Sequence, residues 1–193
     1  MTNEKRIERY KRENDFIIVE VAVKNSRQLF NERDPAPFRE RDLDSQFVIY
    51  LVSAVEEFSL RTKMKIQILT ADPADLKPEN SQIIGDAIRA YFLYESELAK
   101  SKLRKRYRSA RYFFLIGLVA LVVCLSLAQG IESLQSAPYI AKIGSVSFVI
   151  LGWVAVWHPM EALLYDWWPI REQRQYFDKM ANMDIEVIGF KQS

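Results

Sequence analysis

The sequence has one cysteine, one histidine, 6 glycines and 7 prolines among 193 residues. With Cys124 alone, an intrachain disulfide and a cysteine-based zinc site within one chain are both excluded. Any catalytic arrangement that needs histidine would have to use His158. Nucleotide-binding glycine motifs, the metalloprotease helix motif and the EF-hand pattern are all missing, so we expect no cofactor and no metal. A net charge of +2 argues against a nucleic-acid partner.

Long uncharged runs are the strongest signal that is present. Residues 112–131 carry no charge over twenty residues, and a helix of that length spans about 30 Å, the thickness of a bilayer core. Residues 143–160 form a second, weaker run. Pro138 can begin the helix that contains this run, because proline suits the first turn of a helix. We expect a transmembrane hairpin over 111–160, with spans at about 112–131 and 139–158. The alternatives are a buried core helix for the first run and a re-entrant or interfacial segment for the second.

A cluster of basic residues precedes the first run. Its members are Lys102, Arg104, Lys105, Arg106, Arg108 and Arg111. The positive-inside rule then places both termini in the cytoplasm. The same cluster could bind anionic lipid headgroups, although its role in topology is a sufficient explanation. Because residues 1–14 contain no apolar stretch, we expect no cleaved signal peptide.

The remaining sequence predicts a small α/β domain over residues 15–110, with a parallel or mixed sheet and helices. Residues 1–14 form a charged segment, expected to be a solvated helix or a frayed tail. Residues 16–23 are rich in β-branched types and residues 64–69 alternate apolar with polar, so each predicts a strand. Asp44 can cap the helix between them, which makes the strand pair parallel. A long helix follows from about Glu79, and nothing in the sequence stops it before the membrane.

The last segment, residues 161–193, predicts an interfacial helix and a strand. Pro169 can begin a helix in an aromatic-rich stretch suited to the membrane surface. Met183, Ile185 and Val187 then alternate with acids. Because a lone strand is unstable in water, we expect this strand to return to the cytoplasmic sheet.

The loop over residues 29–44 contains the densest group of charged residues in the sequence. The candidate ligand or partner residues are Arg33, Asp34, Arg39, Arg41 and Asp42. The arginines could bind an anion or a partner protein through paired donors. The alternative is a charged loop that pairs with itself, with Asp44 as a helix cap and Phe38 inserted in the core. A carboxylate metal site is less favoured, because charge density does not fix a coordination geometry.

Small residues recur on both predicted spans. They are Gly117, Ala120, Cys124 and Ala128 on the first, and Ser145, Gly152 and Ala155 on the second. Such residues allow close helix packing, either within the chain or at an oligomer seam. No charged residue lies in the middle of a span, which argues against ion-coupled transport. A pore formed by several chains is kept as an alternative. We expect His158 to be an interfacial residue without a role.

The segments LFNERDPAPFRERDLD and LLYDWWPIREQRQYF resemble parts of uncharacterised bacterial inner-membrane proteins that have a cytoplasmic α/β part and two spans. The resemblance implies a bacterial inner-membrane location and no known activity. We expect a homo-oligomeric interaction or sensing module, without enzymatic activity, that contacts membrane lipid and a cytoplasmic protein partner. The alternatives are an oligomeric pore or membrane-perturbing effector gated by the cytoplasmic domain, and, third, a carboxylate-based enzyme.

Overall fold

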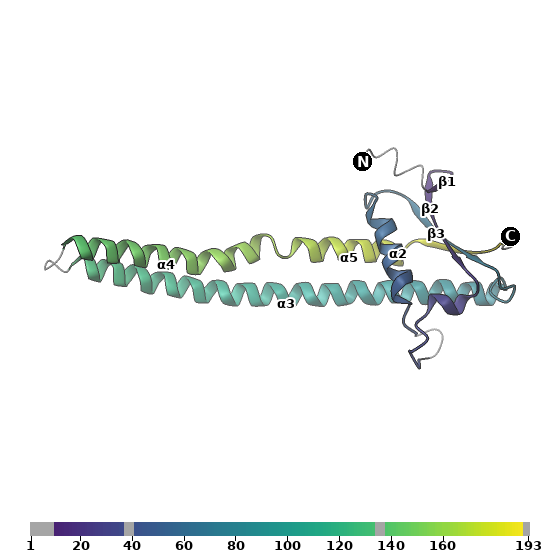
Figure 1. The fold of residues 1–193 in the computed structure, drawn as a ribbon, viewed down its shortest axis with the longest axis horizontal. Helices are drawn as coiled ribbons and strands as arrows, with labels where there is room; N and C mark the ends of the chain where they lie inside the picture. Colours follow the sequence, from purple (N-terminus) through teal and green to yellow (C-terminus); the bar gives the residue numbers. More distant parts are fainter. Residues whose placement is uncertain (1–9, 37–40, 134–137, 191–193) are drawn as a thin grey trace. The chain divides into compact units, whose positions relative to one another are not determined.

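The computed structural model describes residues 10–36, 41–133 and 138–190. The chain divides into two compact units. Met1–Leu98 and Gln173–Ser193 form the first, which we call the α/β unit, and Ala99–Glu172 form the second, the helical unit. Figure 1 shows both units, coloured along the chain from purple to yellow.

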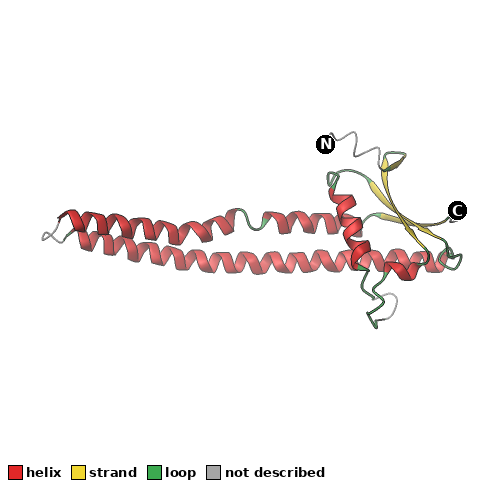
Figure 2. Ribbon diagram, in the orientation of Figure 1, coloured by secondary structure: helices red, strands yellow, loops and turns green. Residues whose placement is uncertain are grey.

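The α/β unit is built on one four-stranded sheet, shown in yellow in Figure 2. Its strands follow one another across the sheet in chain order: β1 (Lys11–Glu13), β2 (Phe16–Val23), β3 (Met64–Thr70) and β4 (Asp184–Gly189). β1 pairs antiparallel with β2, and the other two pairings are parallel. The sheet is therefore mixed, which agrees with the predicted fold class. The strand predicted near the end of the chain lies beside β3, although the two are more than a hundred residues apart.

One face of the sheet carries the core. Val19 is in register with Ile66, and Ile66 with Ile185, so these three side chains point to the same face. Val19 and Ile66 are fully buried. Because this face is apolar along three strands, it needs a covering layer of helices.

Three helices supply that layer. α2 (Ser45–Glu56), the first turns of α3 (Pro78–Glu132) and the last turns of α5 (Trp168–Ala181) place buried apolar residues in one cluster with the sheet. As predicted, Asp44 caps α2: its carboxylate accepts hydrogen bonds from the amides of Gln46 at 2.9 Å and Phe47 at 3.1 Å. A short 3₁₀ helix, η1 (Ser26–Leu29), follows β2. The order of strand, helix and strand thus produces the parallel pair that the sequence predicts.

Two elements differ from expectation. Lys11–Glu13 is a strand and neither a helix nor a frayed tail, because its backbone pairs with Phe16–Ile18 of β2. α5 was expected to lie on a membrane surface, yet Phe177 is 6% exposed and Met180 fully buried in the α/β core. The second half of α5 is therefore a core helix of the α/β unit.

The helical unit contains most of α3 and all of α4 (Pro138–Leu164), which runs back beside it (Figure 1). α3 is one continuous helix from the α/β unit into the predicted first span. Both helices are long and apolar enough to cross a membrane. In the most apolar stretch of α3, only 11% of the residues are buried. In the most apolar stretch of Tyr139–Ala181, the buried share is 17%. Their apolar side chains therefore lie mainly on the outside of the unit.

Candidate functional site

The loop between η1 and α2 closes on itself at its base. Phe30 and Leu43 form an antiparallel bridge, and the amide of Asn31 donates to the carbonyl oxygen of Asp42 at 2.8 Å. The amide of Asp44 donates to the carbonyl oxygen of Leu29 at 2.9 Å. Leu29, Phe30 and Leu43 are all buried. These contacts fix both ends of the loop on the core, and we call residues 29–36 and 41–44 the clasp.

Asp34 organises the clasp from within. Its carboxylate accepts hydrogen bonds from the amides of Ala36 at 3.0 Å and Asp42 at 2.8 Å. These two amides, with a smaller contribution from the charge of Arg41, lower the pKa of Asp34 below its usual 3.8. Asp34 therefore serves the loop itself, as the self-pairing interpretation requires. Arg39 and Phe38 lie outside the described residues.

A groove of about 790 Å³ lies between the clasp, α2 and α3. Its apolar lining includes Val48, Tyr91 and Ile49, whose side chain is 58% exposed. The charged residues on its lining are Glu32, Arg33, Asp42 and Asp44. Among the described lining residues, three carboxylates lie beside one guanidinium. Burial and nearby acids raise the pKa of Tyr91, so its hydroxyl stays protonated at neutral pH.

The structure brings together only part of the predicted polar site. Arg33 and Asp42 line the groove, whereas Asp34 is engaged inside the clasp. The Nε atom of Arg41 is buried and has no hydrogen-bond partner among the residues that the structure describes. Of the three predicted arginines, Arg33 is thus the one found among the described lining residues.

Comparison with protein-family models, with curated proteins and with solved structures finds no match to this chain. Within residues 10–36, 41–133 and 138–190, no three His, Cys, Asp or Glu side chains come together in a way that could hold a metal ion.

Asp75 is a buried polar residue that the sequence analysis did not single out. Asp75 is 6% exposed, and its carboxylate accepts hydrogen bonds from the amide of Ser26 at 2.8 Å and from the hydroxyl of Ser26 at 2.6 Å. The hydroxyl of Thr70 donates a third bond at 2.8 Å. Asp75 thereby joins the loops that follow β2 and β3 at the carboxyl edge of the sheet. An acid in a turn-rich loop directly after a strand is the signal that could have identified it.

In the helical unit, the predicted small residues of α3 and α4 meet each other. An ideal Cβ atom at Gly117 would lie 2.6 Å from the carbonyl oxygen of Ala155, and one at Gly152 would lie 3.1 Å from Cβ of Cys124. Ala128 and Ser145 are also buried, at 4% exposed each, while Ala120 is half-buried. The hydroxyl of Ser145 donates to Glu132 at 2.8 Å. The structure thus uses these residues in a seam within one chain.

Pro159 lies one turn after Ala155, whose carbonyl oxygen faces Gly117. It lies inside α4 and has no N–H, so the carbonyl of Ala155 has no donor four residues later. Gly117 sits directly against that oxygen, and one of its α-hydrogens points along the direction that a Cβ would take. A weak Cα–H···O contact can therefore reach the carbonyl that the proline left without a partner.

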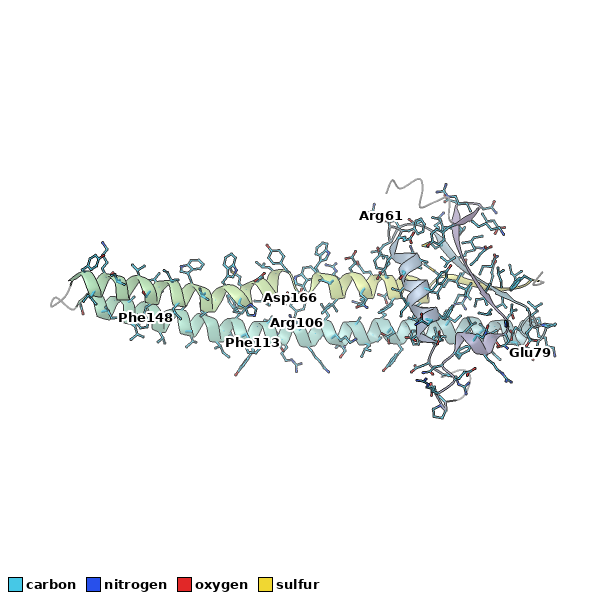
Figure 3. The ribbon with its side chains drawn as sticks, in the orientation of Figure 1. Arg61, Glu79, Arg106, Phe113, Phe148 and Asp166 are labelled. Carbon is cyan, nitrogen blue, oxygen red and sulfur yellow. The ribbon has the colours of Figure 1, made fainter. Side chains whose placement is uncertain are left out.

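The residues of the basic cluster before the first span differ in their contacts. Arg106 pairs with Asp166, and Figure 3 shows the two side chains facing each other. Tyr107 stacks on Trp167 with ring centroids 6.2 Å apart, and the guanidinium of Arg171 lies 5.5 Å from the same indole centroid. Arg104, Lys105, Arg108 and Arg111 are exposed and have no ion pair among the described residues.

Proposed function

We propose that this protein is an integral membrane protein whose helical unit inserts as a two-span hairpin. The observation that carries the proposal is the outward exposure of its apolar side chains. Phe113, Val119 and Val154, for example, are 59%, 64% and 63% exposed. A water-soluble protein rarely exposes a continuous apolar surface of this extent, whereas lipid chains would cover it.

In this proposal both termini lie in the cytoplasm. The support is the excess of basic residues before the first span, compared with Lys142 alone at the start of the second. Trp157, Tyr165 and Trp168 are each more than half exposed, as expected of aromatic residues at a membrane interface. The resemblance stated above would place the protein in a bacterial inner membrane.

The proposed role of the α/β unit is that of an interaction module, which acts in a homo-oligomer and without enzymatic activity. Its support is the groove beside the clasp, where Ile49 and Tyr91 provide apolar contact and Glu32 and Asp42 provide negative charge. A segment of a cytoplasmic partner protein that carries basic and apolar residues would match this lining.

A pore has less support. A pore would need polar groups directed away from the hairpin, toward an axis shared by several chains. The hydroxyls of Ser126 and Ser147 instead donate to Val122 and Ile143 on their own helices, at 2.9 and 2.8 Å. Ser145 is occupied by Glu132 within the hairpin.

Four measurements test the proposal. Alkaline carbonate should leave the protein in the membrane fraction, and a cysteine at Ser133 should react with impermeant reagents only from outside. The mass in mild detergent should exceed that of one chain. A photo-crosslinking residue at Ile49 should give an adduct of defined mass, whereas one at exposed Glu79, outside the groove, should not. Release by carbonate refutes membrane insertion, and equal labelling at both positions refutes the groove as the interaction site.

A further inference from the structure

Four exposed basic residues of α3 that have no ion pair among the described residues form one stripe. Lys102 is also exposed and has no ion pair there, but it lies on the side of Arg106, four residues later. Arg104, Arg108 and Arg111 are four and three residues apart, so they lie on the same side of the helix, and Lys105 is three residues before Arg108. All four are exposed. Ala99 and Ala110, which are 3% and 6% exposed, mark a different side, where α3 is covered. We call these four residues the outer basic stripe.

Arg106 belongs to the same cluster but has a different environment. Its guanidinium is held by the carboxylate of Asp166, and the neighbouring Tyr107 stacks on Trp167. The charge of Arg106 is therefore compensated within the chain. The four residues of the outer basic stripe have no such partner among the described residues, so their charges are available to a ligand.

The position of the stripe along α3 matches the depth of lipid headgroups. The uncharged run begins at Tyr112, whose side chain is 64% exposed. At 1.5 Å per residue, Arg111 and Arg108 lie roughly 1.5 and 6 Å outside it, within a headgroup layer about 5–7 Å thick. Arg104 and Lys105 lie about one turn further out, and their long side chains can reach back toward that layer.

We propose that the outer basic stripe is a binding site for the phosphate groups of anionic phospholipids. The inference rests on the proposed membrane insertion of the helical unit. Guanidinium groups suit phosphate because they donate paired hydrogen bonds to its oxygens. The site would hold the cytoplasmic end of the first span at a fixed depth, while Arg106 stays a structural residue that ties α3 to the segment after α4.

Two double variants distinguish lipid binding by the outer basic stripe from a general effect of the positive charge on α3. Arg104→Gln with Arg108→Gln removes two stripe charges, and Lys102→Gln with Arg106→Gln removes two charges from the same helix with the same spacing. The full-length protein in neutral detergent is titrated with phosphatidylglycerol or phosphatidylcholine while its thermal unfolding is followed. A bound lipid raises the unfolding temperature according to its affinity.

We expect phosphatidylglycerol to stabilise the wild-type protein more than phosphatidylcholine does. The Arg104→Gln/Arg108→Gln variant should lose roughly thirtyfold in apparent affinity for phosphatidylglycerol, about fivefold for each basic residue. The Lys102→Gln/Arg106→Gln variant should keep the preference, with a lower starting unfolding temperature. Raising the salt concentration should weaken the wild-type preference.

Each other result overturns the inference. An equal loss in both variants would mean that net charge alone attracts the lipid. If soluble glycerol phosphate competes as well as the lipid, the site binds free phosphate and not a membrane component. A protein that resists carbonate extraction yet shows no phosphatidylglycerol preference refutes the stripe alone, whereas release by carbonate refutes the proposed membrane insertion itself.

Discussion

Substituting Gly117 with alanine should open the seam between α3 and α4. The new methyl group would lie 2.6 Å from the carbonyl oxygen of Ala155 and 3.3 Å from the Cα atom of Val156. Both are backbone atoms, so no side chain can rotate out of the way. The helices must separate by about 0.8 Å before the methyl–oxygen distance reaches 3.4 Å, the shortest ordinary contact.

The cost follows from that separation. A gap of roughly 0.5–1 Å removes a quarter to a half of the dispersion attraction between facing atoms. Forcing an extra methyl into a packed interface typically costs about 1–3 kcal/mol, which corresponds to a shift of roughly 5- to 150-fold between closed and open seam. Gly130→Ala is the matched control, because a Cβ at Gly130 would have no neighbour within 4 Å.

The reactivity of the Cys124 thiol can show whether the seam between α3 and α4 has opened. Cys124 is the only cysteine in the chain, is half-buried, and contacts the Gly152 position. In detergent, a small maleimide should alkylate it faster in Gly117→Ala than in the wild type, while Gly130→Ala should react at the wild-type rate. Equal rates in all three proteins, with equal unfolding temperatures, would show that α3 and α4 do not approach each other at Gly117.

Three further predictions concern the α/β unit. Asp75→Ala should destabilise it by about 1–3 kcal/mol, measured by denaturant unfolding, because Ser26 and Thr70 lose their buried acceptor; an unchanged midpoint would contradict this. Asp34 has a folded-state pKa below 3.8, so its stabilisation of the clasp is present above pH 3.8 and is lost as the pH falls through the folded pKa. The protection of the Asp42 amide, measured as its exchange rate relative to the intrinsic rate at each pH, should then fall in acid, and Asp34→Asn should remove that dependence; a variant that keeps the wild-type pH dependence would show that another group causes it. Truncation after Ala181 removes β4 and buried Met183, so limited proteolysis should cut residues 15–98 faster than in the full chain; equal resistance would mean that β4 adds nothing to the sheet.

Elements with a clear local pattern could be predicted from the sequence. β2 and β3 are rich in β-branched or alternating apolar residues, and α2 has both a cap at Asp44 and apolar residues at helical spacing. β1 could not be found in this way, because Lys11–Glu13 is charged and becomes a strand only by pairing with β2. The place of the second half of α5 in the core could not be predicted for a similar reason. The partners that bury Phe177 and Met180 come from distant parts of the chain.

The candidate groove could also be predicted only in part from the sequence. The charged residues of its rim belong to one loop and could be recognised there. Its apolar side needs Ile49 from α2 and Tyr91 from α3, which only the fold brings together. The arginine site stays a prediction: Asp34 is hydrogen-bonded within the clasp, and Arg33 lies beside three carboxylates among the described lining residues.

The parallel pairing of β3 with β4 imposes an order on biosynthesis. β4 leaves the ribosome only after residues 99–172, which at 5–20 residues per second takes roughly 4–15 s. During this interval the edge of β3 that β4 will occupy has no partner strand, and the buried positions of α5 have not yet reached the core. An unpaired strand edge is a site for aggregation. The α/β unit therefore cannot mature ahead of the helical unit, and a chain that stalls in the apolar helices would remain a recognisable substrate for chaperones and proteases.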